Sequence, residues 1–143
     1  MNSILAVLDT NVCLDLFVFR DPSVKPFHDA IKANAFHVIT RKDCREEWLR
    51  VLDYPKLDLN ELEKERSKLE FDKLIHLISP EERDHHLLPV CSDKDDQKFL
   101  ELAFDARAAC LITKDKALLK LARKNIRNGF FRIISPEHWK QLI

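Results

Sequence analysis

The residues best placed for chemistry are acidic side chains that recur along the whole chain. Asp9 directly follows an apolar run at residues 4–8, and Asp115 follows a second apolar run at residues 110–113 in the same way. Ligands bind beyond the carboxyl ends of parallel strands, so two carboxylates at such ends should lie close together. Aspartate is also a good helix N-cap, so each residue could instead only cap the next helix.

Helical spacing selects a third acid. In the helix predicted over residues 43–53, Glu47 comes three residues after Cys44 and four before Val51. Positions with this spacing share one face of a helix, so Glu47 belongs to the apolar, inward side. Its neighbour Glu46 falls on the solvent side.

The same test selects a fourth acid in the helix predicted over residues 95–108. Asp96 precedes Phe99 by three positions and therefore continues the apolar stripe. Asp93 is better placed as the N-cap. Asp95 is either a second acid beside the site or a favourable charge in the first helical turn.

Four converging carboxylates would repel one another, and an inward carboxylate is costly unless something pairs with it. Mg²⁺ or Mn²⁺ would relieve both problems, because these ions prefer oxygen ligands. Such ions activate water and hold a phosphodiester for in-line attack. The chain has one glycine and no Gly-rich phosphate loop, which argues against nucleoside triphosphate chemistry.

The elements that must position these acids follow from the pattern of apolar runs. Apolar strands that alternate with helices indicate a parallel sheet covered on both faces, and 143 residues suit one domain, residues 1–143. Strands are expected at residues 4–8, 36–39, 110–113 and 131–134, with a short edge strand at 87–90. Helices are expected at residues 23–34, 43–53, 59–77, 95–108, 116–125 and 136–142.

Composition limits the function classes. The 24 basic and 24 acidic residues cancel, which argues against tight non-specific coating of nucleic acid but leaves a nucleic-acid substrate open. No apolar run is long enough for a membrane span, and residues 1–8 lack the basic region and cleavage site of a signal peptide. None of the four cysteines forms a CxxC pair, so we expect reduced, buried thiols and a cytoplasmic location.

Four segments, in this order and at these spacings, resemble the PIN domain family. They read LDTNV at residues 8–12, EWLRVLDYPK at 47–56, DKDDQKFLELA at 93–103 and LITKD at 111–115. The resemblance runs from about residue 4 to residue 134, and the nearest branch is that of bacterial toxin components of toxin–antitoxin systems.

The resemblance implies a three-layer α/β/α sandwich with a mostly parallel sheet and RNA cleavage that depends on Mg²⁺ or Mn²⁺. It also implies an antitoxin protein as a partner, and a homodimer is a further expectation. Carried over by position, the four acids that serve both as catalytic residues and as metal ligands are Asp9, Glu47, Asp96 and Asp115. Supporting polar positions are Thr10, Asn11 and Thr113, with Asp93 beside them.

Several basic residues near the expected site could hold RNA phosphates. The chain has Lys114 where the family often has a glycine, and Lys94 where it often has a proline. Arg41, Lys42 and Arg45 lie at the start of the helix that carries the second acid. Each of these side chains could bind phosphate or simply be solvated.

Three other functions use similar residues. A phosphatase of the haloacid dehalogenase type needs a second aspartate two positions after the first, where this chain has Asn11. A response-regulator receiver domain needs a phosphoacceptor aspartate after a central strand, and none is well placed. A catalytically inactive PIN-fold scaffold is the third. The charged segment 59–77 is either a surface helix or part of a clamp for an antitoxin or a second subunit.

Overall fold

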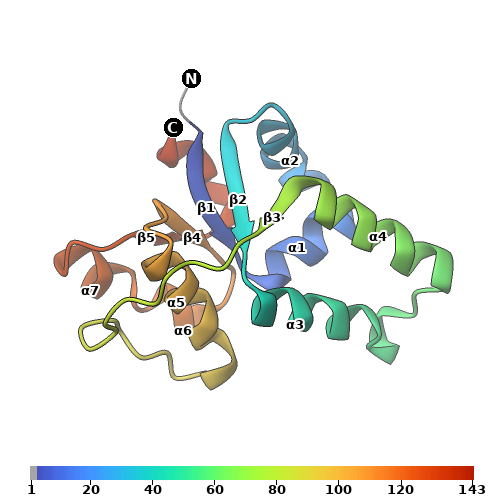
Figure 1. Cartoon of the computed structure of the whole chain (residues 1–143). Helices are drawn as coiled ribbons and strands as arrows, with labels where there is room; N and C mark the ends of the chain where they lie inside the picture. The colour runs from blue at the N-terminus through green and yellow to red at the C-terminus, as the bar shows by residue number, and fades with distance from the viewer. Residues whose placement is uncertain (1–2) are drawn as a thin grey trace.

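The central feature of the computed structural model, which describes residues 3–143, is a five-stranded parallel sheet in the order β3-β2-β1-β4-β5 (Figure 1). Met1 and Asn2, at the start of the apolar N-terminal run, lie outside the described residues. The middle strand is β1, which pairs with β2 on one side and β4 on the other. The strands are β1 (Ile4–Leu8), β2 (Phe36–Thr40), β3 (Ile75–Leu77), β4 (Cys110–Ile112) and β5 (Arg132–Ile134).

Helices cover both faces of this sheet, which confirms the three-layer α/β/α sandwich (Figure 1). Successive side chains of a strand point to opposite faces, so Ala6 and Leu8 enter one core and Val7 enters the other. The first core is closed by α1 (Thr10–Phe17), α2 (Lys25–Lys32), α3 (Lys42–Leu52) and α4 (Glu61–Leu74). The second is closed by α5 (Gln97–Asp105), α6 (Lys116–Leu119) and α7 (Ala122–Arg127).

Aromatic side chains anchor the first core. Trp48 of α3 stacks on Phe71 of α4 with ring centroids 5.1 Å apart, and the edge of Phe17 from α1 meets both rings at 6.0 Å. Each buried aromatic removes a large apolar area from water, so these three rings hold the three helices against one another. Consequently α3 is anchored at Trp48, the residue next to Glu47.

Two expected elements differ from the structure. The helix expected at residues 59–77 ends at Leu74, and Ile75–Leu77 forms the edge strand β3 beside β2. The β-branched Ile75 suits an extended strand, and parallel pairing with β2 satisfies the backbone there. The strand expected at residues 87–90 is absent: the Gln97 side chain accepts from the Cys91 N–H (2.7 Å) and donates to the Pro89 carbonyl (3.1 Å), so this segment is held as a loop.

The helices differ from expectation in number as well as at their ends. The helix α1 was not among the expected elements, and the single helix expected at 116–125 is broken into α6 and α7. Single turns of 3₁₀-helix, η1 (Pro22–Val24) and η3 (Lys94–Asp96), precede α2 and α5, and two more 3₁₀ segments are η2 (Pro55–Leu57) and η4 (Pro136–Leu142). Because helix ends often tighten into 3₁₀ turns, sequence patterns locate helices better than their boundaries.

All four cysteines are buried and unpaired, as expected from their apolar surroundings. In the part of the chain that the structure describes, we find no helix with the length and apolar character needed to cross a membrane.

Candidate active site

Three aspartates that are far apart in the sequence meet at the carboxyl edge of the sheet. Asp9 follows β1, Asp115 follows the neighbouring strand β4, and Asp96 lies in η3 at the start of α5. One carboxylate oxygen from each lies within 4.8 Å of the other two. Because β1 and β4 are paired in parallel, the fold itself places the first two acids side by side.

Asp9 is held by a polar residue that directly follows β4, and its side chain does not cap α1. It occupies the N-cap position of α1, yet its side chain makes no capping bond to that helix. Its Oδ2 instead accepts a hydrogen bond from the hydroxyl of the fully buried Thr113 at 2.7 Å. Burial raises the pKa of Asp9 to about 6, and the bond from Thr113 opposes part of that rise.

Asp96 and Asp115 share a hydrogen bond between their carboxyl groups. Burial, reinforced by this bond and by the charge of Asp9, raises the pKa of Asp96 to about 8. The same bond lowers the pKa of Asp115, so the shared proton belongs to Asp96. Asp115 also caps α6, because it accepts from the Ala117 N–H at 2.8 Å. Capping and membership of the cluster therefore coexist in this residue.

The cluster has the donor set of a site for a hard divalent cation. Within residues 3–143, no Lys, Arg or His side chain pairs with any of the three aspartates within 4.0 Å. The buried Oδ2 atom of Asp96 has no hydrogen-bond partner. An unpartnered buried oxygen is costly, and cations such as Mg²⁺ and Mn²⁺ take carboxylate oxygens as ligands. The residues present fit such an ion.

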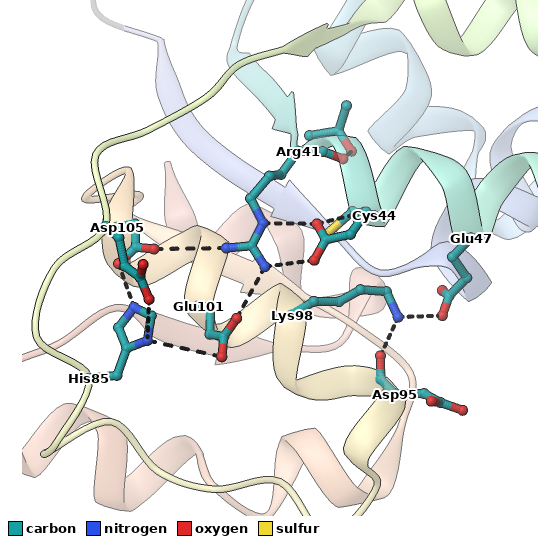
Figure 2. A network of polar contacts seen from close by, with 11 residues as sticks. Arg41, Cys44, Glu47, His85, Asp95, Lys98, Glu101 and Asp105 are labelled. Carbon is teal, nitrogen blue, oxygen red and sulfur yellow. Dashed lines mark hydrogen bonds and ion pairs between the residues drawn. The ribbon is translucent and has the colours of Figure 1, made fainter.

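Glu47 lies beside this cluster but outside it. Its carboxylate accepts one hydrogen bond from the Thr10 hydroxyl and forms an ion pair with Lys98 Nζ at 2.7 Å, which also donates to the Asp95 carbonyl (Figure 2). Glu47 points inward while Glu46 is exposed, as the spacing predicted. The group of oxygens within 4.8 Å of one another does not include Glu47, whose carboxylate is paired with Lys98 of α5. A role for Glu47 as the fourth metal ligand stays a prediction.

Lys98 is a residue near the site that the sequence reasoning missed. Its side chain is only 15% exposed, which is unusual for a lysine. The sequence does contain a signal, since Lys98 precedes Leu102 by four positions and Leu102 is fully buried. An apolar residue at that spacing places the lysine on an inward face of α5.

The supporting polar residues take different positions. Thr10 and Thr113 contact acids directly, at Glu47 and Asp9 respectively. Asn11 accepts a long hydrogen bond, 3.5 Å, from the Lys114 N–H. Asp93 is exposed and caps η3 through the Asp95 N–H at 3.0 Å, as its position suggested.

Three of the basic residues considered for RNA binding are already paired with carboxylates. Arg41 contacts Asp43 at 2.8 Å, Glu101 at 3.1 Å and the buried Asp105 at 3.8 Å (Figure 2). Asp105 has a second basic neighbour in His85, at 2.7 Å. The other two pairs are Arg45 with Asp72 (2.8 Å) and Lys114 with Asp15 (2.6 Å).

These pairs leave little free positive charge at the start of α3. Lys42 is exposed, and no carboxylate in residues 3–143 pairs with it within 4.0 Å. The RNA-binding role of these four residues stays a prediction.

Comparison with known proteins adds one finding. A family model described as PIN domain matches residues 5–117, which includes Asp9, Glu47, Asp96 and Asp115. No curated protein matches the sequence at a significant level.

Proposed function

This chain belongs to the PIN domain family, whose members are generally nucleases, and we propose that it is an endoribonuclease that uses Mg²⁺ or Mn²⁺ to hydrolyse RNA phosphodiester bonds. The observation that carries the proposal is the cluster of Asp9, Asp96 and Asp115, whose oxygens lie within 4.8 Å of one another. The partnerless oxygen of Asp96 supports it, because a divalent cation would give that atom a partner.

Under this proposal the three aspartates would hold the ion, which when bound would polarise the phosphate and activate a water molecule. Thr113 keeps the Asp9 carboxylate aimed into the cluster through its hydroxyl. Asp96 must release its proton before both of its oxygens can serve as ligands, since its pKa is raised to about 8. Glu47, held by Thr10 and Lys98, lies beside the cluster, where its charge adds to the negative field.

A cleavage assay on defined RNAs of mixed sequence, labelled at the 5′ end, tests this function. We expect cleavage with Mg²⁺ or Mn²⁺, products that carry a 5′-phosphate, and complete loss of activity in EDTA. Asp93→Asn is the matched control for Asp96→Asn, because both replace a carboxyl group of η3 or its N-cap by an amide and only Asp96 belongs to the cluster.

Two results would contradict the proposal. Cleavage that survives complete chelation, or a 2′,3′-cyclic phosphate product, would indicate metal-free acid–base chemistry. A folded protein that binds Mg²⁺ but cuts no RNA in a broad panel would favour the inactive PIN-fold scaffold.

We further propose that the enzyme is the toxin of a toxin–antitoxin pair, with an antitoxin protein as its partner. This part rests on the resemblance of the four motif segments to the bacterial toxin branch. Induced expression of the wild-type chain in a bacterial host should stop growth, while Asp96→Asn should not. Growth arrest that Asp96→Asn causes equally would show that toxicity does not come from cleavage. The proposal also includes a homodimeric state. The cleavage assay on defined RNAs would identify the RNA that is cut.

A further inference from the structure

The positive charge of this protein is unevenly distributed. Between residues 116 and 132 the chain has six basic residues and no acidic one, although basic and acidic residues number 24 each over the whole chain. This segment forms α6, α7 and the start of β5, and it begins directly after Asp115. The six are Lys116, Lys120, Arg123, Lys124, Arg127 and Arg132.

The basic residues of this segment are not paired with the protein's own acids. Within residues 3–143, no carboxylate lies within 4.0 Å of any of the six, whereas Arg45 and Lys98 each have one and Arg41 has three. Arg123 and Arg127 are exposed and lie four positions apart on α7, so they share one side of the helix. An unneutralised group of this kind attracts polyanions.

The same segment borders two hollows that adjoin one another. One, of about 880 Å³, is lined at one end by Lys114 and Lys116, the residues on either side of Asp115 in the sequence. The other, of about 700 Å³, has Arg123, Arg127 and Arg132 around it. Both are lined by Ala122, Ile133 and Ile134, so they meet at these side chains. We call the two hollows together the α7 trough.

The α7 trough adjoins the aspartate cluster through β5. The Ile134 carbonyl, at the end of β5, accepts a hydrogen bond from the Thr113 N–H at 3.0 Å, and the Thr113 hydroxyl binds Asp9. Thr113 therefore links Ile134, which lines the trough, to Asp9 of the aspartate cluster.

The floor and the rim of the trough differ in character. Its far part has an apolar floor that includes the half-exposed Ile126 (51%), with only arginines as charged neighbours. The near part also contains Asp15, Asp21 and Glu137, of which Asp15 is paired with Lys114. Positive charge is thus least compensated at the far part, away from the acidic cluster.

We propose that the α7 trough binds single-stranded RNA next to the bond that is cut, with phosphates on Arg123 and Arg127 and bases against the apolar floor. This inference rests on the proposed ribonuclease function and names the surface that positions its substrate. Single-strand sites combine a basic groove for the backbone with flat side chains, mostly aromatic, against which the bases lie. Here the surface offered to the bases is aliphatic and includes Ala122 and Ile126. Paired bases could not reach the floor, so the trough discriminates against duplexes.

Fluorescence anisotropy of a 5′-labelled, unstructured RNA of about 12 nucleotides tests the proposal, on a length scale typical of single-strand sites. Binding is measured in EDTA, so no cleavage is needed for the readout. The variant is Arg123→Gln with Arg127→Gln. Its matched control is Arg50→Gln with Arg66→Gln, which removes the same charge from two exposed arginines on α3 and α4.

We expect the α7 double variant to bind the RNA about tenfold more weakly at low salt than the control variant. Loss of two phosphate contacts should also reduce the slope of log K against log salt by about 1.4, at roughly 0.7 per contact on single strands. Ile126→Ser should weaken binding without changing that slope, since it removes apolar contact and no charge. In cleavage assays, the double variant should raise KM and leave kcat nearly unchanged.

The outcomes separate this inference from the proposed function. RNA binding that depends on Arg123 and Arg127, together with no cleavage under any metal, would remove the proposed catalysis and keep the trough. A double variant that binds and cuts RNA like the wild type would overturn the trough alone. An equal loss in the Arg50 and Arg66 control, or an equal loss for duplex RNA, would also overturn it, because either result would reflect general charge only.

Discussion

Two groups of three carboxylates lie along α5, and they differ in what neutralises them. Asp43, Glu101 and Asp105 surround the guanidinium of Arg41 (Figure 2), and we call this set the arginine group. Asp9, Asp96 and Asp115 form the aspartate cluster, which has no basic side chain of residues 3–143 paired with it.

The difference in neutralisation appears in the proton affinities. Hydrogen bonding to Arg41 lowers the pKa of Asp43, while burial raises the pKa of Asp96 to about 8. The first group is internally complete and serves the fold. The second is built so that something from outside the chain must balance its charge, and this is the property of a site.

The largest expected effect that separates the two groups is on cleavage. Asp96→Asn or Asp9→Asn should reduce kcat on the order of 10²–10³-fold or more, the scale of losing one electrostatic contact to the transition state. Glu47→Gln should reduce it less than Asp96→Asn, since Glu47 lies outside the cluster and is already paired with Lys98. Steady-state rates on one labelled RNA measure all three.

Two results would contradict the predicted order of these variants. A Glu47→Gln enzyme as inactive as Asp96→Asn would mean that Glu47 joins the aspartates during catalysis, as the sequence motif implied. An Asp9→Asn enzyme with wild-type rates would leave Asp9 as a structural residue only.

The second effect is on the free energy of unfolding. Here a change in the arginine group should cost more than a change in the aspartate cluster. Arg41→Met removes the guanidinium that lies 3.8 Å from the buried Asp105, and His85 at 2.7 Å stays as its basic partner. Because breaking a buried pair is strongly destabilising, the change should remove about 3 kcal/mol of unfolding free energy. Asp9→Asn relieves repulsion within the aspartate cluster and should change stability by no more than about 1 kcal/mol, in the stabilising direction. Urea unfolding at neutral pH without divalent metal measures both.

A surface pair provides the control for the Arg41 result. Arg45→Met breaks the more exposed pair with Asp72 and should cost under about 1 kcal/mol. Equal losses for Arg41→Met and Arg45→Met would mean that the arginine group contributes no more than an ordinary surface ion pair.

The third effect is the response to Mg²⁺. An ion that binds only the folded state adds about 2.7 kcal/mol at 100 times its Kd, so the thermal midpoint of the wild type should rise with Mg²⁺. Asp96→Asn should lose most of that rise, while Arg41→Met should keep it despite a lower starting Tm. A Mg²⁺-dependent rise that survives in Asp96→Asn would place the ion elsewhere on the protein.

The last effect is on the pH dependence of the metal-free protein. Asp9 and Asp96 have folded pKa values of about 6 and about 8, above the ordinary aspartate value of 3.8, so the folded state holds protons that the unfolded chain releases. Their contribution to stability therefore falls as pH rises from about 4 to 8. The lowered pKa of Asp115 acts only below about pH 4, so it leaves this trend unchanged.

Asp96→Asn should flatten this decline, and unfolding midpoints between pH 4 and 8 in EDTA would measure it. The arginine group should respond in the opposite sense: because the pKa of Asp43 is lowered, its contribution is present above about pH 4 and is lost as pH falls below that. Wild-type stability that rises from pH 4 to 8 would contradict the raised values for Asp9 and Asp96.

Much of the fold could be predicted from the sequence because its signals are local. Strands such as β1, β2 and β4 are short apolar runs, and α3 has a clear apolar stripe. The misassigned elements lack such signals or depend on distant partners. Ile75–Leu77 becomes a strand only because β2 is beside it, and the loop before α5 is held by the Gln97 side chain.

By itself the sequence determined which acids face inward and which of them follow strands, since periodicity and strand ends are properties of neighbouring residues. Only the tertiary structure decided which charges neutralise one another. Arg41 and Arg123 are alike as sequence letters, yet Arg41 contacts three carboxylates, while none in residues 3–143 lies within 4.0 Å of Arg123. Glu47 is likewise paired with Lys98, 51 residues away in the sequence. Electrostatic energy depends on distances in space, and these emerge only when the helices pack on the sheet.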